Sequence, residues 1–199
     1  MTKSKKDIDF FKINFTTNNY IKFMIYIIPT DTCFGLACPT NDIEGYTEIY
    51  KLKNRDYSKL IAIMLPDFES LEKYTFVTDE QIEFLKNYNK PFSVLLQPKN
   101  KENLINKNIK NYNLYDKISF RVASEINKDF LNKTGAIFLT SANISGFPET
   151  YKIEEIKEQF GENFKNLEII GNTEILAKTN PSDIIEFDKN NEIIYLRKN

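Results

Sequence analysis

Hydroxyl, amide and cationic side chains gather in three stretches of this sequence, and together they could bind a phosphate-bearing ligand. Two hydroxyls, Thr30 and Thr32, follow an apolar run that ends at Pro29. A second polar turn, Thr140 to Asn143, lies far downstream. Between them, a helical pattern ends in four cations within nine residues: Lys51, Lys53, Arg55 and Lys59. Hydroxyls after a strand and cations after a helix suggest a site for a polyanion and a polar second substrate.

Each of these stretches also has an ordinary structural explanation, which the sequence leaves open. Thr, Ser, Asn and Asp favour turns after strands and cap helices. Cations complement the negative pole of a helix dipole, although only Asp56 opposes the four cations of residues 51–59. Lys53 and Arg55 lie near the expected end of the helix, where their side chains could converge on phosphate oxygens.

Arg121 lies inside an apolar segment, residues 118–122, whose pattern predicts a strand. Arginine is rarely buried unless it is paired, so an acidic side chain or a ligand carboxylate or phosphate is expected beside it. Ser182 and Arg197 are weaker candidates on their own. The sequence contains no glycine-rich phosphate-binding motif and no GxSxG nucleophile motif.

Histidine is absent from all 199 residues. This excludes Ser-His-Asp and Cys-His catalysis and most catalytic zinc sites. Cys33 and Cys38 have no partners with which to complete a tetrahedral metal site; two reduced thiols are favoured, and a disulfide stays possible. We therefore expect no metal bound by the protein alone, and chemistry done by hydroxyls, amides, Lys, Arg, carboxylates or a metal held by the substrate.

The length and composition predict one globular domain, residues 1–199, with a polar and frayed stretch at about residues 1–9. Hydrophobic residues make up 41% and charged residues 28% of the chain. The net charge of −1 gives no overall attraction to nucleic acid. The apolar run at residues 23–28 is too short to span a membrane, so we expect a cytosolic protein.

Alternating strand and helix patterns predict an α/β domain with a mixed sheet. Strands are expected at residues 10–15, 22–28, 60–65, 92–97, 118–122, 136–140, 168–170, 183–187 and 192–197. Helices are expected from a cap at Asn41 or Asp42 to about residue 53, at 67–74, from Thr78 to about 88, at 126–131, and after a cap at Thr150. Residues 99–113 are expected to form an exposed loop or irregular helix.

Four segments, in order, resemble the YrdC-like family, the threonylcarbamoyl-AMP synthases. They are PTDTCFGL (29–36), IYKLKNRDYSK (49–59), ISFRVA (118–123) and TSANISGFP (140–148). Fainter similarities lie in PSDIIE (181–186) and IYLR (194–197). The resemblance spans about residues 20–197, and the ordered set is more specific than any single segment.

The resemblance implies an open, twisted mixed sheet with flanking helices around a concave basic cavity. It implies a nucleotidyltransferase that converts L-threonine, bicarbonate and ATP into threonylcarbamoyl-AMP and pyrophosphate. Mg²⁺ would be held mainly by the ATP phosphates. The product would serve tRNA threonylcarbamoyladenosine formation through a separate transferase complex, with any tRNA contact indirect.

The resemblance also implies roles for individual residues. Lys53 and Arg55 would be catalytic. The ATP-binding residues would be Arg55, Lys59, Asn143, Thr150 and Arg197. The threonine-binding residues would be Thr30, Thr32, Arg121, Ser141 and Ser182.

Two rival functions remain from the sequence. One is a non-catalytic RNA- or nucleotide-binding module on the same fold, which the local cations would support and the overall charge does not. The other is a carbamoyl-transferring relative, although such proteins usually carry further domains.

Overall fold

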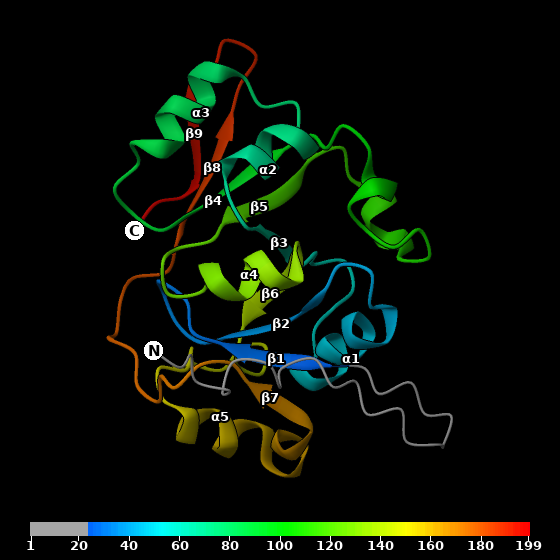
Figure 1. Cartoon of the computed structure of the whole chain (residues 1–199), viewed down its shortest axis with the longest axis vertical. Helices are drawn as coiled ribbons and strands as arrows, with labels where there is room; N and C mark the ends of the chain where they lie inside the picture. The colour runs from blue at the N-terminus through cyan, green and yellow to red at the C-terminus, as the bar shows by residue number, and fades with distance from the viewer. Residues whose placement is uncertain (1–23) are drawn as a thin grey trace, which may run out of the picture.

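A single curved sheet of nine strands forms the centre of the molecule (Figure 1). The computed structural model describes residues 24–199. The strand order is β7-β1-β2-β6-β3-β5-β4-β8-β9. The strands are β1 (Ile25–Ile28), β2 (Gly35–Pro39), β3 (Ala62–Leu65), β4 (Phe92–Leu96), β5 (Ile118–Val122), β6 (Ile137–Ser141), β7 (Leu167–Ile169), β8 (Asp183–Phe187) and β9 (Ile193–Arg197).

The sheet is mixed, as the sequence predicts. β1 and β2 form an antiparallel hairpin whose turn contains both Thr30 and Thr32, and β2 continues into antiparallel pairing with β6. β3 pairs in parallel with β5, and β4 pairs in parallel with β8. This order brings the turn after β1 beside the end of β6, two polar segments that lie about a hundred residues apart in the chain.

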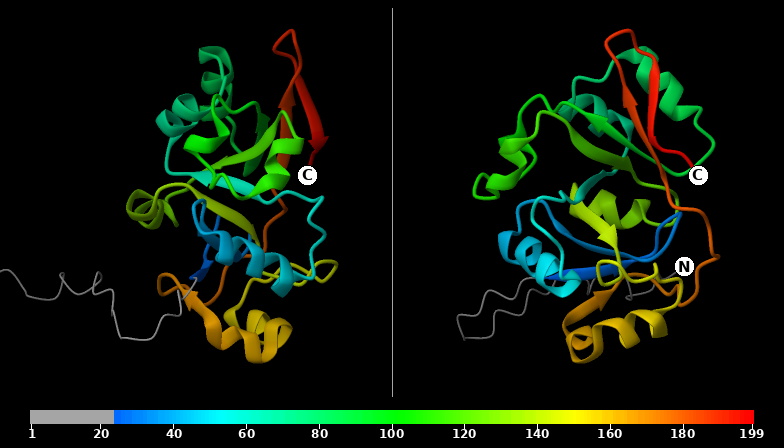
Figure 2. Two further views of the ribbon diagram at one scale, coloured as in Figure 1. Left: turned by 90° about the vertical axis from the view of Figure 1, so that its right-hand side faces the viewer. Right: turned by 180° about the vertical axis from the view of Figure 1, so that it is seen from behind.

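Within residues 24–199, five α-helices and three short 3-10 turns pack around the sheet. Figures 1 and 2 show α2 and α3 at the end formed by β4, β8 and β9, and α5 beside β7 at the opposite end. The helices are α1 (Ile43–Lys53), α2 (Phe68–Tyr74), α3 (Asp79–Lys86), α4 (Lys128–Thr134) and α5 (Ile153–Phe160). The 3-10 turns are η1 (Lys101–Asn103), η2 (Lys110–Leu114) and η3 (Gly161–Asn166).

Helix capping follows the sequence signals at three helix starts. The Asp42 carboxylate accepts a hydrogen bond from the Gly45 amide at the start of α1. Asp67 caps α2 in the same way, and Thr78 with Gln81 forms the expected capping box of α3. Each side chain satisfies an amide that the helix leaves unpaired.

Thr150 does not cap α5, which corrects the sequence prediction. The helix begins at Ile153, and the Glu155 carboxylate accepts from the amides of Tyr151 and Lys152 at 2.6 and 3.1 Å. The Thr150 hydroxyl instead donates to the Ala142 carbonyl at 2.8 Å. A glutamate at the third helical position supplies the acceptor, so the threonine is free to support the second polar turn.

The structure differs from the predicted elements at residues 99–113 and 126–131. The segment 99–113 does form irregular turns, but it is not simply exposed, because Leu104, Ile105, Ile109 and Tyr112 are buried in the core. The helix expected at 126–131 begins two residues later, at Lys128. The strand expected at 10–15 and the frayed stretch at 1–9 lie outside the described residues.

The two faces of the sheet carry different cores, as the period of a strand requires. Along β3, Ile63 and Leu65 belong to the larger core, whereas Met64 packs on the opposite face with the smaller cluster. Gly35 allows β2 to approach β6 closely, because a Cβ at that position would collide with the Leu139 side chain. The strand expected at residues 60–65 begins at Ala62, and its residues 63–65 are buried on both faces of the sheet, as predicted.

Candidate functional site

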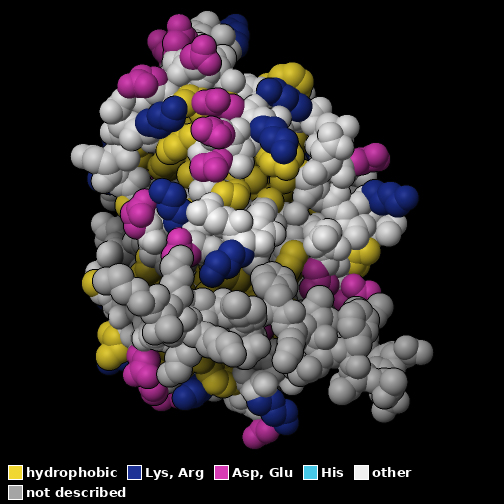
Figure 3. Space-filling model, viewed as in Figure 1, with side chains coloured by type: hydrophobic (Ala, Val, Ile, Leu, Met, Phe, Trp, Pro, Cys, Tyr) yellow, Lys and Arg dark blue, Asp and Glu magenta, His cyan; other side chains and the backbone are white. Residues whose placement is uncertain are grey.

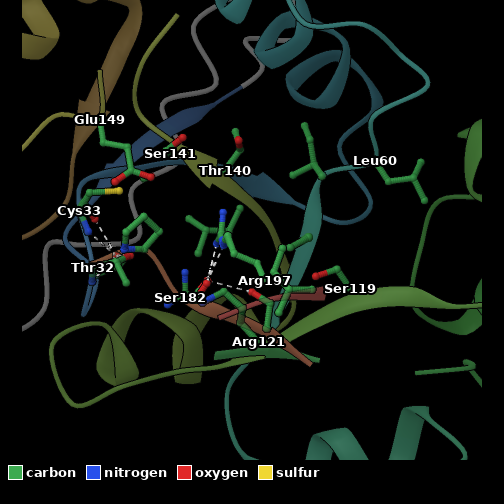
Figure 4. Close-up of a pocket in the computed structure, with 18 of the residues that line it drawn as sticks. Thr32, Cys33, Leu60, Ser119, Arg121, Thr140, Ser141, Glu149, Ser182 and Arg197 are labelled. Atoms are coloured by element: carbon green, nitrogen blue, oxygen red, sulfur yellow. Dashed lines mark hydrogen bonds between the residues drawn. The ribbon is translucent and has the colours of Figure 1, made fainter. Parts of the chain in front are cut away.

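A cavity of about 310 Å³ lies on the sheet face opposite the larger core (Figure 4). In β5, Ser119 and Arg121 line it, whereas Ile118 and Phe120 between them point into the larger core. Its other polar or charged lining residues are Thr30, Thr32, Cys33, Arg55, Ser93, Thr140, Ser141, Glu149, Ser182 and Arg197. Three arginines and one glutamate give the lining a positive balance.

The turn after β1 places two threonine hydroxyls at the cavity. The Thr30 hydroxyl oxygen accepts from the Thr32 and Cys33 amides at 3.2 and 3.3 Å and donates to the Cys33 carbonyl at 2.6 Å. The Thr32 hydroxyl lies 3.0 Å from that of Thr30. Thr30 therefore shapes the turn, and Thr32 has more hydrogen-bonding capacity left for a ligand.

Arg121 finds the acidic partner that its sequence context led us to expect. One terminal guanidinium nitrogen lies 2.5 Å from the Asp31 carboxylate, and the Arg121 side chain is 12% exposed. Its Nε is buried and has no hydrogen-bond partner among residues 24–199. A buried guanidinium with an unused N–H, on a residue that lines a cavity, can donate to a carboxylate or phosphate oxygen.

Lys53 joins the end of α1 to the second polar turn. Its ammonium donates to the carbonyls of Ser141 and Asn143, the latter at 2.6 Å, and to the Asn143 side-chain oxygen at 3.1 Å. The Ser145 amide donates to the Lys53 carbonyl at 2.8 Å. Lys53 is only 2% exposed and does not line the cavity. Burial, with a smaller contribution from the charge of Arg55, lowers the pKa of Lys53 to about 7.

Replacing Lys53 by methionine is expected to lower the free energy of unfolding by about 2 to 4 kcal/mol, because two backbone carbonyls would lose their donor. The lowered pKa means that the unfolded chain binds more protons between pH 7 and the ordinary lysine range. The stability advantage of wild type over Lys53→Met should therefore grow as the pH rises from 7. Urea unfolding of both proteins across this range measures it, and an advantage that shrinks with pH contradicts it.

Arg55 lines the cavity from the loop after α1, residues 54–61, which we call the arginine loop. The loop begins at Asn54, whose φ of 48° ends the helix in a left-handed conformation. Arg55 donates from Nε to the Lys59 carbonyl and from Nη2 to the Leu60 carbonyl, both at 2.9 Å. These bonds fold the loop around the guanidinium, which is half-buried at the cavity edge.

The other predicted ATP-binding residues differ in their positions. Arg197 lines the cavity and donates to the Ser182 carbonyl from Nε and Nη2 at 2.9 and 2.6 Å. Lys59, Asn143 and Thr150 do not line the cavity. The Asn143 amide bonds to Lys53, Ser141 and Phe147, which makes it a brace of the second polar turn.

The predicted threonine-binding residues all lie at the cavity: Thr30, Thr32, Arg121, Ser141 and Ser182. They come from the turn after β1, from β5, from the end of β6 and from the residue before β8. The Ser141 hydroxyl donates to the Asn143 side chain at 2.6 Å, and the Ser182 hydroxyl lies 3.3 Å from that of Ser93. Their roles in binding a ligand stay predictions.

The sequence did not single out Glu149 or Ser119, which also line the cavity. Glu149 comes directly after the segment 140–148 and belongs to no motif of its own, and the Tyr151 hydroxyl donates to its carboxylate at 3.2 Å. In Figure 4, Glu149 lies close to Cys33. Burial, and secondarily the charge of Glu149, raises the pKa of the Cys33 thiol to about 11. A thiol of this kind is a poor nucleophile at neutral pH.

Replacing Cys33 by alanine is expected to leave turnover within about threefold of wild type, because burial and the nearby charge of Glu149 keep the thiol protonated at neutral pH. In the wild-type protein, Cys33 should react with iodoacetamide at pH 8 about 100 times more slowly than an exposed thiol. Mass spectrometry of the alkylated peptide measures the rate. Rapid alkylation together with an inactive Cys33→Ala variant would contradict this assignment.

A family model matches the whole of the described part of the chain. The Sua5/YciO/YrdC model, whose description reads "Telomere recombination", matches residues 23–199. The chain belongs to the Sua5/YciO/YrdC family. The resemblance suggested by the four motifs is thereby confirmed, and so is the fold that it implied.

Two relatives align with this chain over most of their own length. A protein of Haemophilus ducreyi named threonylcarbamoyl-AMP synthase is 29% identical over 160 residues, which cover 78% of this chain and 83% of that protein. A Buchnera aphidicola protein of the same name is 29% identical over 177 residues, covering 84% and 94%.

A solved structure of the family supports the fold. The structure of P. abyssi Sua5 complexed with L-threonine matches with a TM-score of 0.71 at 24% identity, over 87% of this chain and 50% of that one. This chain therefore spans about half the length of that Sua5 chain.

The described part of the chain contains neither a membrane-spanning helix nor a cluster of metal-binding side chains. Among residues 24–199, no helix is both long enough and apolar enough to cross a membrane. Within the same residues, no cluster of three or more His, Cys, Asp or Glu side chains is placed to hold a metal ion.

Proposed function

We propose that this protein is a threonylcarbamoyl-AMP synthase, a nucleotidyltransferase that makes threonylcarbamoyl-AMP and pyrophosphate from L-threonine, bicarbonate and ATP. The observation that carries the proposal is the cavity itself. It combines the arginine loop, the hydroxyl turn after β1 and the second polar turn, which are the segments that resemble the family. The two relatives named as synthases favour this function over the RNA-binding alternative.

Arg55 and Arg197 bind the ATP phosphates in this proposal. Their guanidinium groups neutralise the charge that develops on the α-phosphate and the leaving pyrophosphate. Lys53 acts through the fold, because its ammonium is fully engaged with the second polar turn. Asn143 and Thr150 support the site in the same way, through hydrogen bonds within the second polar turn. The Lys59 side chain is exposed, and it is the Lys59 carbonyl that accepts from Arg55.

Arg121 binds the threonine carboxylate in this proposal. Its unused Nε supplies a charge-assisted hydrogen bond beside the Asp31 pair. The hydroxyls of Thr32, Ser141 and Ser182 surround the same space and can hold the amino acid's polar atoms. These partners match a small zwitterion with a side-chain hydroxyl.

The reaction needs no imidazole, which fits a chain without histidine. The threonine amine attacks the carbon of bicarbonate and water leaves, or it adds to CO₂ and loses a proton; either route forms a carbamate anion. A carbamate oxygen then attacks the α-phosphorus of ATP, and the bond to the β-phosphate breaks to release pyrophosphate. Because the attacking group is already anionic, alignment and charge neutralisation supply most of the rate.

Mg²⁺ enters this proposal with ATP. Arginines and hydroxyls dominate the lining, and Glu149 is its one carboxylate among residues 24–199. Such a donor set suits a metal held by phosphate oxygens and water better than one held by a protein cage. The metal would supply charge neutralisation on the phosphates.

The rival RNA-binding module finds little support on the face shown in Figure 3. There, Lys and Arg side chains lie scattered among Asp and Glu side chains rather than in a continuous stripe. RNA binding to a phosphate backbone requires a contiguous positive surface. In this proposal tRNA takes no direct part in the reaction at the cavity.

The product also implies a consumer. Threonylcarbamoyl-AMP is an activated mixed anhydride, so an acyl-transfer enzyme must use it before it is hydrolysed by water. We propose that a separate transferase complex passes the threonylcarbamoyl group to tRNA. A cytosolic location belongs to the same proposal, and the two free, buried thiols of Cys33 and Cys38 suit a reducing compartment.

The proposal is tested by incubating the purified protein with L-threonine, bicarbonate, ATP and Mg²⁺. Pyrophosphate release should depend on threonine and on bicarbonate, and mass spectrometry should detect threonylcarbamoyl-AMP. Omitting either substrate is the internal control. A folded protein that releases no pyrophosphate, or releases it without threonine, contradicts the proposal. A steep salt dependence of RNA binding without turnover would favour the rival module.

A further inference from the structure

A chain of hydrogen bonds links the core to the arginine loop. Asn111 Nδ2 donates to the Tyr46 hydroxyl at 2.7 Å, and the Tyr46 hydroxyl donates to that of Tyr50 at 3.0 Å. The Tyr50 hydroxyl then donates to the Lys59 carbonyl at 3.0 Å. The same carbonyl accepts the Nε–H of Arg55, so the chain ends at the cavity arginine itself.

The segment that provides Asn111 touches the arginine loop at several further points. We call residues 110–115, which include η2, the clamp. Asn111 also donates to the Tyr57 carbonyl at 3.2 Å. The Tyr115 hydroxyl donates to the Ser58 carbonyl at 2.8 Å, and the Tyr112 hydroxyl donates to the Ile61 carbonyl at 2.5 Å. Tyrosine and asparagine side chains thus donate to four backbone carbonyls of the loop, those of residues 57, 58, 59 and 61.

Packing alone does not explain these hydroxyls. Tyr46 and Tyr50 are 3% and 1% exposed, and their rings contact other aromatic rings. Phenylalanine would fill the same space without placing a polar group inside an apolar core, which is costly unless it is paired. The Tyr57 ring also stacks on Tyr50, with centroids 4.3 Å apart. The chain of hydrogen bonds therefore ties the exposed arginine loop to the packed core.

We propose that Tyr46, Tyr50 and the clamp are positioning residues that hold Arg55 in the geometry needed for phosphate binding. The inference rests on the proposed function in one respect only: it takes the phosphate ligand to be ATP. None of these residues touches the cavity, so their effect reaches the ligand through the Lys59 carbonyl and Arg55. The irregular segment 99–113 thereby gains a role that its Asn- and Lys-rich composition does not suggest.

The test compares Tyr50→Phe with Thr75→Val. Tyr50→Phe keeps the ring and its stacking but removes the hydrogen bond to Lys59. Thr75→Val is the matched control, because it also removes one buried hydroxyl that donates to a backbone carbonyl, that of Leu71, at the end of α2 away from the cavity. Amide hydrogen exchange of residues 55–61 should be about five to ten times faster in Tyr50→Phe and unchanged in the control.

ATP recognition should change with the loop. The KM for ATP is expected to rise about five- to tenfold in Tyr50→Phe while the KM for threonine stays at the wild-type value. Tyr115→Phe, at an exposed position that does not threaten folding, should change both readouts in the same direction by a smaller factor. Faster exchange with an unchanged KM for ATP overturns the positioning role, and so does exchange equal to that of Thr75→Val.

The outcome separates this inference from the proposed function. If the wild-type protein forms no threonylcarbamoyl-AMP, the proposed function fails, and calorimetric ATP binding replaces the KM. Weaker ATP binding and faster loop exchange in Tyr50→Phe would then still support the clamp. If the wild-type protein makes product and Tyr50→Phe alters neither exchange nor ATP affinity, the clamp fails alone.

Discussion

Replacing Arg121 by glutamine is expected to raise the KM for threonine about 100-fold while the KM for ATP stays close to wild type. A charge-assisted hydrogen bond to a substrate carboxylate contributes about 1.5 to 3 kcal/mol, and glutamine supplies neither the charge nor the reach. Initial-rate kinetics with each substrate varied in turn measure the two constants. An equal loss for both substrates would contradict the assignment of Arg121 to threonine.

Stability needs a control of its own in this experiment. Arg121→Gln leaves the Asp31 carboxylate without its partner, which can weaken the fold independently of binding. The double variant Asp31→Asn, Arg121→Gln removes both charges and should recover thermal stability. We expect it to bind threonine as poorly as the single variant. Recovery of threonine binding in the double variant would mean that the single variant acted through folding.

Replacing Arg55 by alanine is expected to lower kcat/KM for ATP by about 100- to 1,000-fold. The guanidinium supplies positive charge at the cavity edge, where charge develops on the transferring phosphate. Arg55→Lys keeps the charge but loses the two hydrogen bonds to Lys59 and Leu60, so it should recover only part of the rate. Steady-state pyrophosphate release measures all three proteins.

The matched control for Arg55 is Lys165→Ala. Lys165 is an exposed cation paired with Glu162 beyond α5, so its loss changes the net charge by the same amount without reaching the cavity. We expect wild-type kinetics from this variant. If Arg55→Ala performs like Lys165→Ala, Arg55 does not bind the phosphates.

Local patterns in the sequence predicted most of the regular elements, although they missed strand β2. Strands β5 and β8 have the predicted bounds, and α1 and α3 begin at the predicted caps. These predictions succeed because a strand's alternation and a helix cap depend on a few neighbouring residues. Thr150 failed as a cap because a competing local acceptor, Glu155, took the amides.

The site was predictable only in part. Motif order located the threonines, Arg55, Arg121, Ser141, Ser182 and Arg197, all of which line the cavity. The same motifs could not separate cavity side chains from supporting ones. The sequence suggests that Lys53 and Asn143 contact the substrate, yet in the structure they form hydrogen bonds to each other. Whether a polar side chain faces a cavity or a backbone carbonyl depends on strand pairing across about ninety residues, and no local pattern records it.

The clamp illustrates the same limit. Asn111 and Tyr115 stand in a segment whose composition indicates a loop, and nothing in their spacing points to residues 57–61. Only the path of the chain past the end of α1 brings them together.

The most direct measurement is a crystal structure of the protein with ATP and L-threonine bound together. The account predicts one cavity containing both ligands, with phosphate oxygens within hydrogen-bond distance of Arg55 and the threonine carboxylate on Nε of Arg121. Density for either ligand outside the cavity, or a threonine that leaves Arg121 Nε without a partner, would contradict it.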